Sequence, residues 1–254
     1  MSTLLEVSDV AVTFGGLRAL DNVSLSVREA SVTGLIGSNG AGKTTLFNVI
    51  SGLQPASNGR IALGGRDISA LPPNQRAALG VGRSFQNLGL MVDDTIRTNL
   101  LAAQHLSAGY GLGDLALRPW RWISGERRLA RQVAEVAAAF GLTDVLDEVV
   151  ADLSFARARF AELACVLVQR PTLMLLDEPT TGLDGVEIEQ LLTILHCQRD
   201  EGTTILLVAH DVRFVMQLCD QVYVLAEGRN LFDGRPEEVQ RHPAVVEAYL
   251  GRSV

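Results

Sequence analysis

Polar and apolar positions alternate along two early stretches of the chain, residues 4–14 and 23–27. Alternation with a period of two is the pattern of a half-buried strand, and the closeness of the two stretches predicts an antiparallel edge ribbon. A short apolar run at 32–36 then predicts a buried strand. The apolar spacing of residues 43–51 predicts a helix directly after it.

The rest of the chain alternates between short apolar runs and helical spacing, apart from a long helical stretch between about residues 95 and 167. Within that stretch one apolar stripe is formed by Leu129, Val133, Val136 and Phe140. Strands and helices that alternate in this way predict a mainly parallel sheet covered on both faces. The further strands are expected at 60–63, 81–85, 172–177, 203–209 and 221–225, and the further helices at 73–79, 186–199, 211–219, 236–241 and 243–250.

Residues 37–44 form a glycine-rich loop between the predicted strand 32–36 and the predicted helix 43–51, and they read Gly-Ser-Asn-Gly-Ala-Gly-Lys-Thr. This order fits the phosphate-binding pattern G-x-x-x-x-G-K-[ST] in the strand–loop–helix setting that the pattern requires. Backbone N–H groups and the positive end of the helix can hold a phosphate there. Gly37, Gly40 and Gly42 allow positive φ and close backbone approach. Lys43 is then expected to reach the β- and γ-phosphates, and the Thr44 hydroxyl to bind Mg²⁺.

Two adjacent acids, Asp177 and Glu178, follow directly after the apolar run 173–176. Charge at the end of a buried strand is costly unless a ligand or ion meets it. Together with the phosphate loop, these residues predict that Asp177 holds Mg²⁺, directly or through water, and that Glu178 orients and polarises an attacking water. The alternative is a strand that simply emerges into solvent.

Gln86 and His210 also lie at the ends of predicted strands. The amide of Gln86 could contact both a metal and a water. His210 follows strand 203–209 at its carboxyl end, where open parallel sheets bind their ligands. An isolated glutamine is ordinarily solvated and an isolated histidine is ordinarily structural, so neither residue identifies a site by itself.

Composition restricts the functional classes further. The 254-residue chain has 22 basic and 29 acidic side chains, a net charge of −7, which argues against a general nucleic-acid-binding protein. Cys165, Cys197 and Cys219 lack metal-ligand spacing and are expected to be reduced, buried thiols. No apolar run has the length of a membrane span, and the first residues lack a secretion signal, so the protein is expected in the cytosol.

The order of these segments resembles the ATP-binding subunits of ABC transporters over nearly the whole chain. The resemblance rests on the phosphate loop 37–44, Gln86 after Ser84-Phe85, Leu153-Ser154 ahead of a helix, Asp177-Glu178-Pro179, Gly182-Leu183-Asp184, and His210. It implies an α/β fold: a P-loop NTPase (RecA-like) core with an antiparallel β edge subdomain and an inserted α-helical subdomain. The whole chain, 1–254, is then one ABC ATPase domain, with its core at 1–92 and 168–254 and the insertion at 93–167.

The resemblance also implies ATP and Mg²⁺ as cofactors and a head-to-tail dimer that encloses each ATP between two subunits. In this chain Phe14 would stack on adenine, Thr45 would contact the α-phosphate, and the loop residues Gly37, Ser38, Asn39, Gly40, Ala41, Gly42, Lys43 and Thr44 would hold the other phosphates and Mg²⁺. Gln86 and Asp177 would support Mg²⁺, Glu178 would be the general base, and His210 would hold the γ-phosphate. Ser154 and Asp184 would act across the dimer interface. A phenylalanine at the end of a strand is, in general, more often part of the core.

Within this superfamily, several segments look like the ATPases of branched-chain amino acid importers. These are Phe14-Gly15-Gly16-Leu17-Arg18-Ala19-Leu20, Ser84-Phe85-Gln86-Asn87, and the ending 236–251. The partners implied are a second ATPase subunit, transmembrane permease subunits and, indirectly, a solute-binding protein, with no nucleic acid. The implied location is the cytoplasmic face of the cell membrane.

One segment departs from the family pattern. The signature Leu-Ser-Gly-Gly-Gln, often Leu-Ser-Tyr-Gly-Gln in this branch, here reads Leu153-Ser154-Phe155-Ala156-Arg157. The methyl group of Ala156 costs little if φ is negative and about 1–2 kcal/mol or more if φ is positive. Arg157 could pair with a phosphate or crowd it. In the family the signature serves the partner's ATP, so the change favours a heterodimer over a homodimer. It also leaves open an ATP-dependent dimer switch with little hydrolysis and a regulatory role outside transport.

A small-molecule kinase is a further alternative at this stage. Such an enzyme would have the phosphate loop but would not need the glutamine, Leu-Ser, Asp-Glu and histidine series.

One cluster of basic and aromatic residues is compatible with contact to lipid headgroups or a permease loop. It consists of Arg118-Pro119-Trp120-Arg121-Trp122 with Arg127, Arg128 and Arg131. The same cluster is also compatible with a solvated helical face above two packed tryptophans.

Overall fold

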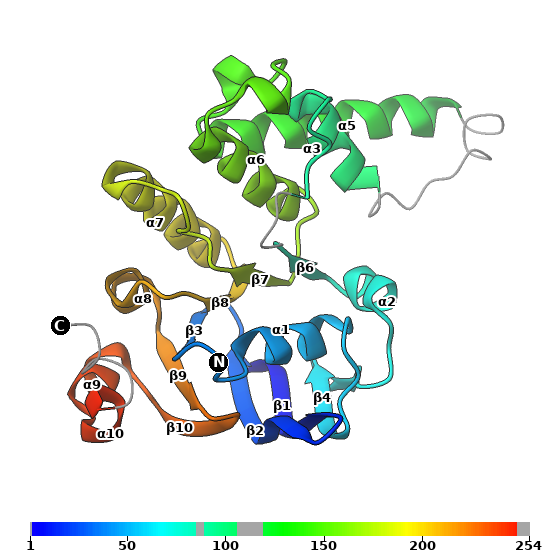
Figure 1. Ribbon diagram of the computed structural model, residues 1–254. Coiled ribbons are helices and arrows are strands. Elements are labelled where there is room, and N and C mark those ends of the chain that lie inside the picture. The colour runs from blue at the N-terminus through cyan, green and yellow to red at the C-terminus, as the bar shows by residue number, and fades with distance from the viewer. Residues whose placement is uncertain (1, 85–88, 106–118, 248–254) are drawn as a thin grey trace. The chain divides into compact units, whose positions relative to one another are not determined.

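The computed structural model describes the backbone of residues 2–84, 89–105 and 119–247 (Figure 1). The chain divides into two compact units. The first contains Met1–Arg83, Thr172–Thr181 and Ile188–Val254, and the second contains Ser84–Pro171 and Gly182–Glu187. In the described part of the chain, no helix combines the length and the apolar character needed to cross a membrane.

The first unit begins with a four-stranded antiparallel sheet in the order β2-β1-β4-β5. Its strands are β1 (Thr3–Phe14), β2 (Leu17–Arg28), β4 (Asn58–Leu63) and β5 (Arg66–Asp67). The antiparallel ribbon predicted at the start of the chain is therefore confirmed, and both of its strands are longer than the alternation alone indicated.

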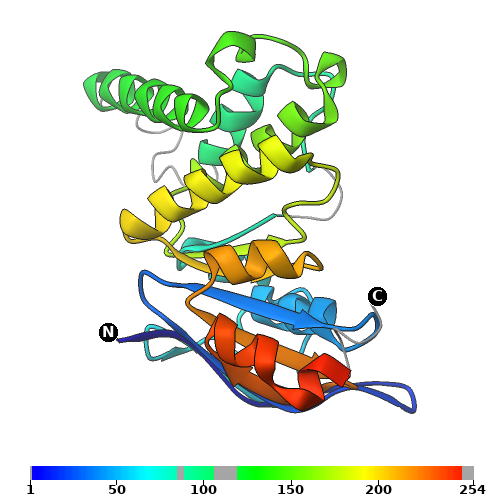
Figure 2. The same ribbon diagram turned by 90° about the vertical axis from the view of Figure 1, so that its left-hand side faces the viewer.

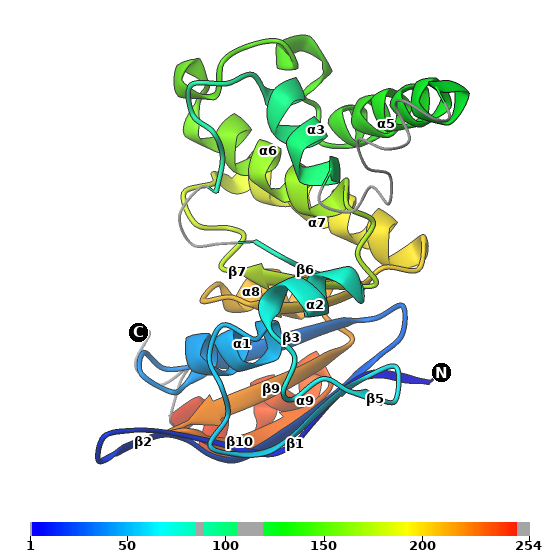
Figure 3. The ribbon, with the colours of Figure 1, turned by 90° about the vertical axis from the view of Figure 1, so that its right-hand side faces the viewer.

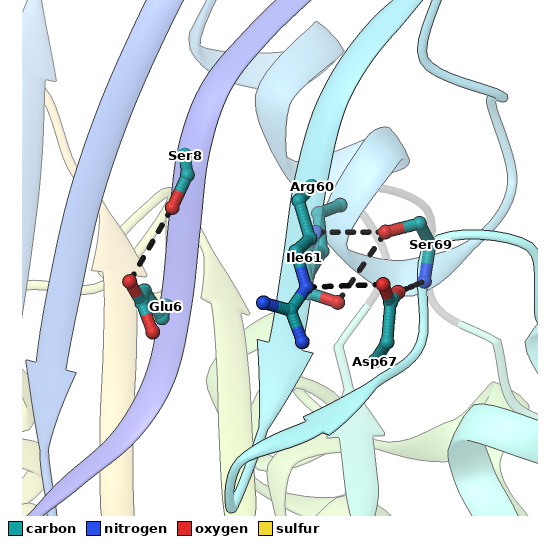
Figure 4. A network of polar contacts seen from close by, with 6 residues as sticks. All are labelled: Glu6, Ser8, Arg60, Ile61, Asp67 and Ser69. Carbon is teal, nitrogen blue, oxygen red and sulfur yellow. Dashed lines mark hydrogen bonds and ion pairs between the residues drawn. The ribbon is translucent and has the colours of Figure 1, made fainter.

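A polar network closes the β4–β5 hairpin of this sheet (Figure 4). The Arg60 Nε donates to Asp67 Oδ2 at 3.0 Å, and the second carboxylate oxygen of Asp67 accepts from the Ser69 N–H at 2.9 Å. The Ser69 hydroxyl oxygen in turn accepts from the Ile61 N–H at 2.8 Å. On the neighbouring strand Ser8 donates to Glu6.

The second sheet of this unit has six strands in the order β10-β9-β3-β8-β7-β6. Neighbouring strands from β9 to β6 pair in parallel, and β10 pairs antiparallel with β9. The strands are β3 (Val32–Gly37), β6 (Val81–Arg83), β7 (Leu173–Asp177), β8 (Thr204–Val208), β9 (Gln221–Ala226) and β10 (Arg229–Gly234). The mainly parallel sheet is confirmed, whereas β10 was not expected from the sequence.

Both faces of this sheet are buried. Leu173 and Leu175 belong to the large apolar cluster that also contains Phe47 of α1 and residues of β1, β2 and β4. The intervening residues Met174 and Leu176 point to the opposite face, and they are fully buried as well. Strands covered on both faces read as continuous apolar runs, which is the pattern seen in the sequence.

The helices of the first unit are α1 (Lys43–Ser51), α2 (Pro73–Ala78), α8 (Val212–Leu218), α9 (Pro236–Arg241) and α10 (Pro243–Val245). Helix α1 contacts β3 and β2, so it lies between the two sheets, where it can be followed in Figure 3. Helix α8 contacts β3 as well, and α8 and α9 lie next to each other in Figure 2. Helix α7 (Gly185–Asp200) runs from one unit into the other.

The second unit is helical. It contains α3 (Ile96–His105), α5 (Pro119–Ala139), α6 (Phe155–Leu167) and the short 3-10 turns η1 (Thr143–Val145) and η2 (Val150–Asp152). Helices α3, α5 and α6 contact one another. The predicted stripe is buried at Leu129, Val133 and Phe140, whereas Ala137 is more deeply buried than Val136.

One expectation about the cysteines is wrong, and two other predicted features lie outside the described residues. Cys197 is exposed, so the expectation of three buried thiols is wrong for this residue. The apolar residues of α7 that face inward are Leu191, Leu192, Ile194 and Leu195, and Cys197 lies off that face. The side chains of the cluster at 118–127 and Gln86 lie outside the described residues.

Candidate functional site

The phosphate loop connects β3 to α1, as the sequence predicted. Gly42 caps α1 with φ of 101°, and Gly37 and Gly40 also have positive φ, 153° and 81°. A Cβ at Gly37 would lie 2.3 Å from the Leu225 carbonyl oxygen. A Cβ at Gly42 would lie 2.8 Å from the Ala19 carbonyl oxygen. Close packing as well as backbone conformation therefore requires glycine at both positions. At Gly40 a Cβ would meet no neighbour, so only the positive φ favours glycine there.

Lys43 is folded back onto the loop that precedes it. Its Nζ donates to the carbonyl oxygens of Gly37 at 2.7 Å and Ser38 at 2.9 Å. Burial lowers the pKa of Lys43, and the nearby carboxylates of Glu178 and Asp177 oppose that shift. The ammonium group thus lies within electrostatic reach of both acids that follow β7.

Asp177 ends β7 and is 1% exposed. A buried carboxylate is stable only with a compensating group. One such group is Arg83 at the end of β6, whose Nη2 lies 3.4 Å from Asp177 Oδ2 and whose Nη1 donates to the Ser51 hydroxyl at 2.7 Å. Burial lowers the pKa of Arg83, and Asp177 opposes that shift. Arg83 was missed from the sequence, where its only signal was its position just before Ser84-Phe85-Gln86.

Glu178 adopts φ of 49°, a left-handed conformation that is unusual for a residue with a Cβ. Its N–H donates to the Val208 carbonyl at 2.8 Å, which fixes the backbone at the end of β8. Its Oε1 lies 2.8 Å from His210 Nε2, and Thr181 donates to Oε2 at 3.4 Å. Strained conformations of this kind persist where the surrounding structure fixes them, and they are concentrated at functional sites.

The first unit therefore brings together the phosphate loop, Lys43, Asp177, Glu178 and His210. The Thr44 side chain is exposed and that of Thr45 is partly buried, next to the loop. Phe14 at the end of β1 is 47% exposed, so it is not a core residue and is open to a ligand.

The oxygen groups of the site suit a magnesium ion. A hydroxyl at Thr44 and a carboxylate at Asp177 are hard ligands of the kind that Mg²⁺ takes in small number together with phosphates. Among the described residues, no three His, Cys, Asp or Glu side chains form a metal cage of their own.

In the second unit, Ser154 and Asp184 begin helices. Ser154 is the N-cap of α6, and its Oγ accepts from the Arg157 N–H at 3.4 Å. The Asp184 carboxylate accepts from the N–H groups of Val186 and Glu187, both at 2.9 Å, in the first turn of α7. Both residues therefore have a structural role as caps in this chain.

The altered signature residues keep an ordinary helical backbone. Ala156 lies in the first turn of α6 and is not among the residues with positive φ, so its methyl group causes no backbone strain. Arg157 forms an ion pair with Asp144 at 3.0 Å. The Phe155 ring covers Gly182, where an added Cβ would lie 2.3 Å from the ring.

Comparison with known proteins agrees with this arrangement. The family described as "ABC transporter" matches residues 20–181, and the family described as "Branched-chain amino acid ATP-binding cassette transporter" matches residues 229–254. The chain belongs to the ABC transporter family. It is an ATP-binding protein and an ATPase.

Curated relatives extend over the full chain. The high-affinity branched-chain amino acid transport ATP-binding protein LivG of Salmonella typhimurium is 37% identical over 251 residues, 98% of both chains. The corresponding protein BraF of Pseudomonas aeruginosa is 37% identical over 253 residues, also 98% of both. LivG of Escherichia coli is 35% identical over 251 residues, again 98% of both.

Solved structures show the same fold. A nucleotide-free ATP-binding cassette from an ABC transporter superposes with a TM-score of 0.85 at 28% identity, covering 98% of this chain and 99% of the other. An ATP-binding cassette in its ADP conformation gives a TM-score of 0.86 at 28% identity, covering 99% of this chain and 100% of the other. The P-loop NTPase fold predicted from the sequence is thereby confirmed.

Proposed function

We propose that this chain is the ATP-hydrolysing subunit of an importer of branched-chain amino acids or similar small polar solutes. The substrate class is supported by the names of the full-length relatives and by the match at residues 229–254. The observation that carries the chemistry is the position of Lys43 within electrostatic reach of Asp177 and Glu178, with His210 against Glu178. The chain acts at the cytoplasmic face of the membrane, held there by permease subunits, and a solute-binding protein delivers the cargo.

The phosphate loop binds the nucleotide through its own backbone. Backbone N–H groups of residues 37–42 and the N-terminus of α1 bind the phosphate oxygens, and Lys43 moves its donors from the loop carbonyls to the β- and γ-phosphates. Thr45 contacts the α-phosphate, and exposed Phe14 stacks on adenine. Thr44, Asp177 and Gln86 would hold Mg²⁺, which would neutralise charge on the β- and γ-phosphates.

Glu178 is the general base. Its carboxylate takes a proton from the water that attacks the γ-phosphate, and the strained backbone of Glu178 holds it in position at the end of β7. His210 Nε2, at 2.8 Å, orients this carboxylate and is placed to reach the γ-phosphate. Arg83 lies 3.4 Å from Asp177 Oδ2 and compensates the charge of this buried carboxylate.

A second ATPase subunit completes each ATP site. The site built from this chain's phosphate loop and the partner's signature segment has all the residues expected for hydrolysis. The other site receives Ser154, Ala156 and Arg157 from this chain, and the Arg157 cation is already paired with Asp144. We therefore favour a heterodimer in which the first site hydrolyses ATP fast and the second slowly, with Asp184 contacting the partner.

The altered signature also favours a second candidate, an ATP-dependent dimer switch with little hydrolysis. Turnover separates the two functions. Phosphate release is measured for the purified chain, for a related ATPase subunit with an intact Leu-Ser-Gly-Gly-Gln signature, and for an equimolar mixture. The heterodimeric ATPase predicts that the mixture exceeds the sum of the two alone and that Glu178→Gln in this chain removes the excess. Tight ATP binding with negligible turnover in every sample would support the switch instead, and equal turnover of the pure chain and the mixture would contradict the asymmetric pair.

A further inference from the structure

The turn between β9 and β10 lies against the phosphate loop. Ala226 pairs with Arg229, and the two residues between them, Glu227 and Gly228, have φ of 49° and 76°. Two consecutive left-handed residues are typical of a tight type I′ hairpin turn. The Gly228 N–H donates to the Ala41 carbonyl at 3.1 Å, and the Gly228 carbonyl accepts from the Asp21 N–H at 2.8 Å. This one residue therefore connects the phosphate loop with β2.

The packing around this connection leaves no space for a side chain. A Cβ at Gly228 would lie 2.7 Å from the Ala19 carbonyl oxygen, and a Cβ at Gly42 would lie 2.8 Å from the same atom. The Leu225 carbonyl on β9 approaches Gly37 in the same way, at 2.3 Å from its hypothetical Cβ. The loop is thus held between β2 on one side and the β9–β10 hairpin on the other.

A charge network fixes the hairpin to β2. Asp21 Oδ2 accepts from Arg229 Nε at 2.7 Å and from Nη2 at 2.5 Å, and Asp21 Oδ1 accepts from Arg18 Nη1 at 2.7 Å. The Asp21 side chain is 10% exposed, whereas both arginines are largely exposed. The hydrogen bonds from Arg229 are the first cause of a lowered pKa of the Asp21 carboxyl, so this carboxylate is ionised at neutral pH.

The geometry of one peptide unit links this network to nucleotide binding. The peptide between Ala41 and Gly42 is planar and trans, so its C=O and N–H point in opposite directions. When Gly228 holds the Ala41 carbonyl toward the hairpin, the Gly42 N–H must point away from the hairpin. Gly42 is the residue that caps α1, and its N–H belongs to the loop that we assign to the phosphates.

We infer that Asp21, Gly228 and Arg229 form a latch that holds the phosphate loop in its nucleotide-binding conformation. Asp21 and Arg229 are positioning residues, because they act through Gly228 and Ala41 and not by touching the nucleotide. This inference rests on the proposed assignment of loop 37–42 to the nucleotide phosphates. It also joins the C-terminal family segment 229–254 to the site, since Arg229 is its first residue.

The test compares Arg229→Gln with a matched control, Arg60→Gln. Arg60 also pairs with an aspartate in the same unit, at 3.0 Å from Asp67, but on the β4–β5 hairpin (Figure 4). Dissociation constants for MgATP, MgADP and adenosine are measured by calorimetry, together with KM, kcat and the melting temperature without nucleotide.

We expect Arg229→Gln and Asp21→Asn to weaken the binding of MgATP and MgADP by about three- to five-fold, with an equal rise in KM and little change in kcat. Adenosine affinity should not change, since adenosine has no phosphate, and Arg229→Lys should recover part of the loss. Arg60→Gln should match the wild type in all of these measurements. A folded Gly228→Ala variant should bind MgATP more weakly than either of these two variants.

The latch is wrong if Arg229→Gln and Asp21→Asn bind MgATP within two-fold of the wild type. It is also wrong if both lower the melting temperature and adenosine affinity along with MgATP affinity, because that pattern shows general destabilisation. Lys43→Ala separates this failure from that of the proposed site. If Lys43→Ala loses affinity for MgATP while the latch variants keep it, only the latch is wrong. If Lys43→Ala binds MgATP with normal affinity, the assignment of the loop to the phosphates is wrong.

Discussion

The phosphate loop in the first unit and the signature segment in the second both end at the start of a helix, yet they differ in how the sequence has changed them. The loop retains each glycine that its backbone requires, and Gly42 caps α1 with φ of 101°. The signature segment retains the Ser154 cap and a regular α6, but all three residues after Ser154 differ from the family signature. The difference at the signature is therefore in the side chains, since the helical backbone that follows Ser154 is regular.

In the proposed pair of ATPase subunits, the two segments act on different ATP molecules. The loop, Asp177 and Glu178 would act on the nucleotide bound by this chain, and Ser154 would act on the nucleotide bound by the partner. At position 157 the family has an amide side chain, whereas this chain has the guanidinium of Arg157. That cation forms an ion pair with Asp144. In the proposed pair, the loop of this chain would therefore serve hydrolysis, and its signature segment would serve binding.

The largest effect is expected at the base. Glu178→Gln should retain MgATP affinity and reduce hydrolysis by at least about a hundred-fold, because an amide cannot accept the proton of the attacking water. Single-turnover phosphate release in the presence of the partner ATPase measures this step. Wild-type turnover of the variant would show that Glu178 is not the base.

A smaller effect is expected at the loop. Lys43→Ala removes an ammonium that makes charge-assisted hydrogen bonds, and we expect MgATP affinity to fall by roughly ten- to a hundred-fold. Calorimetry with MgATP measures it, and the melting temperature controls for folding. Unchanged affinity would contradict the role of the loop and remove the contrast between the two segments.

The smallest effect tests the signature. Ala156→Gly combined with Arg157→Gln restores the last two residues of the family signature on a regular α6. We expect turnover of the pure chain to rise by about two- to ten-fold, the range of one recovered hydrogen bond. Asp144→Asn is the matched control, since it frees Arg157 without changing the signature. A pure chain whose turnover does not respond to the restored signature would show that the two substitutions are not what limits it.

The local parts of the site were predictable, because each depends on residues that are neighbours in the sequence. The strand before the loop and the helix over Lys43–Ser51 occur as expected, and so do the acids at the end of β7. Strand β10 was missed because its two apolar residues, Leu231 and Phe232, are adjacent and do not alternate with polar ones, and the only signal was the Glu227-Gly228 turn. Cys197 was misplaced because helical spacing, not residue type, decides which face of α7 is buried.

The sequence by itself determined that a glycine-rich loop of the phosphate-binding pattern lies between a buried strand and a helix, and that two acids follow a second buried strand. Only the tertiary structure placed Arg83 beside Asp177, 94 residues away, and Arg229 beside Asp21, 208 residues away. These pairs depend on the arrangement of the strands, with β6 beside β7 and the β9–β10 turn against β2. Local periodicity carries no information about that arrangement, because it is fixed by which buried faces pack together.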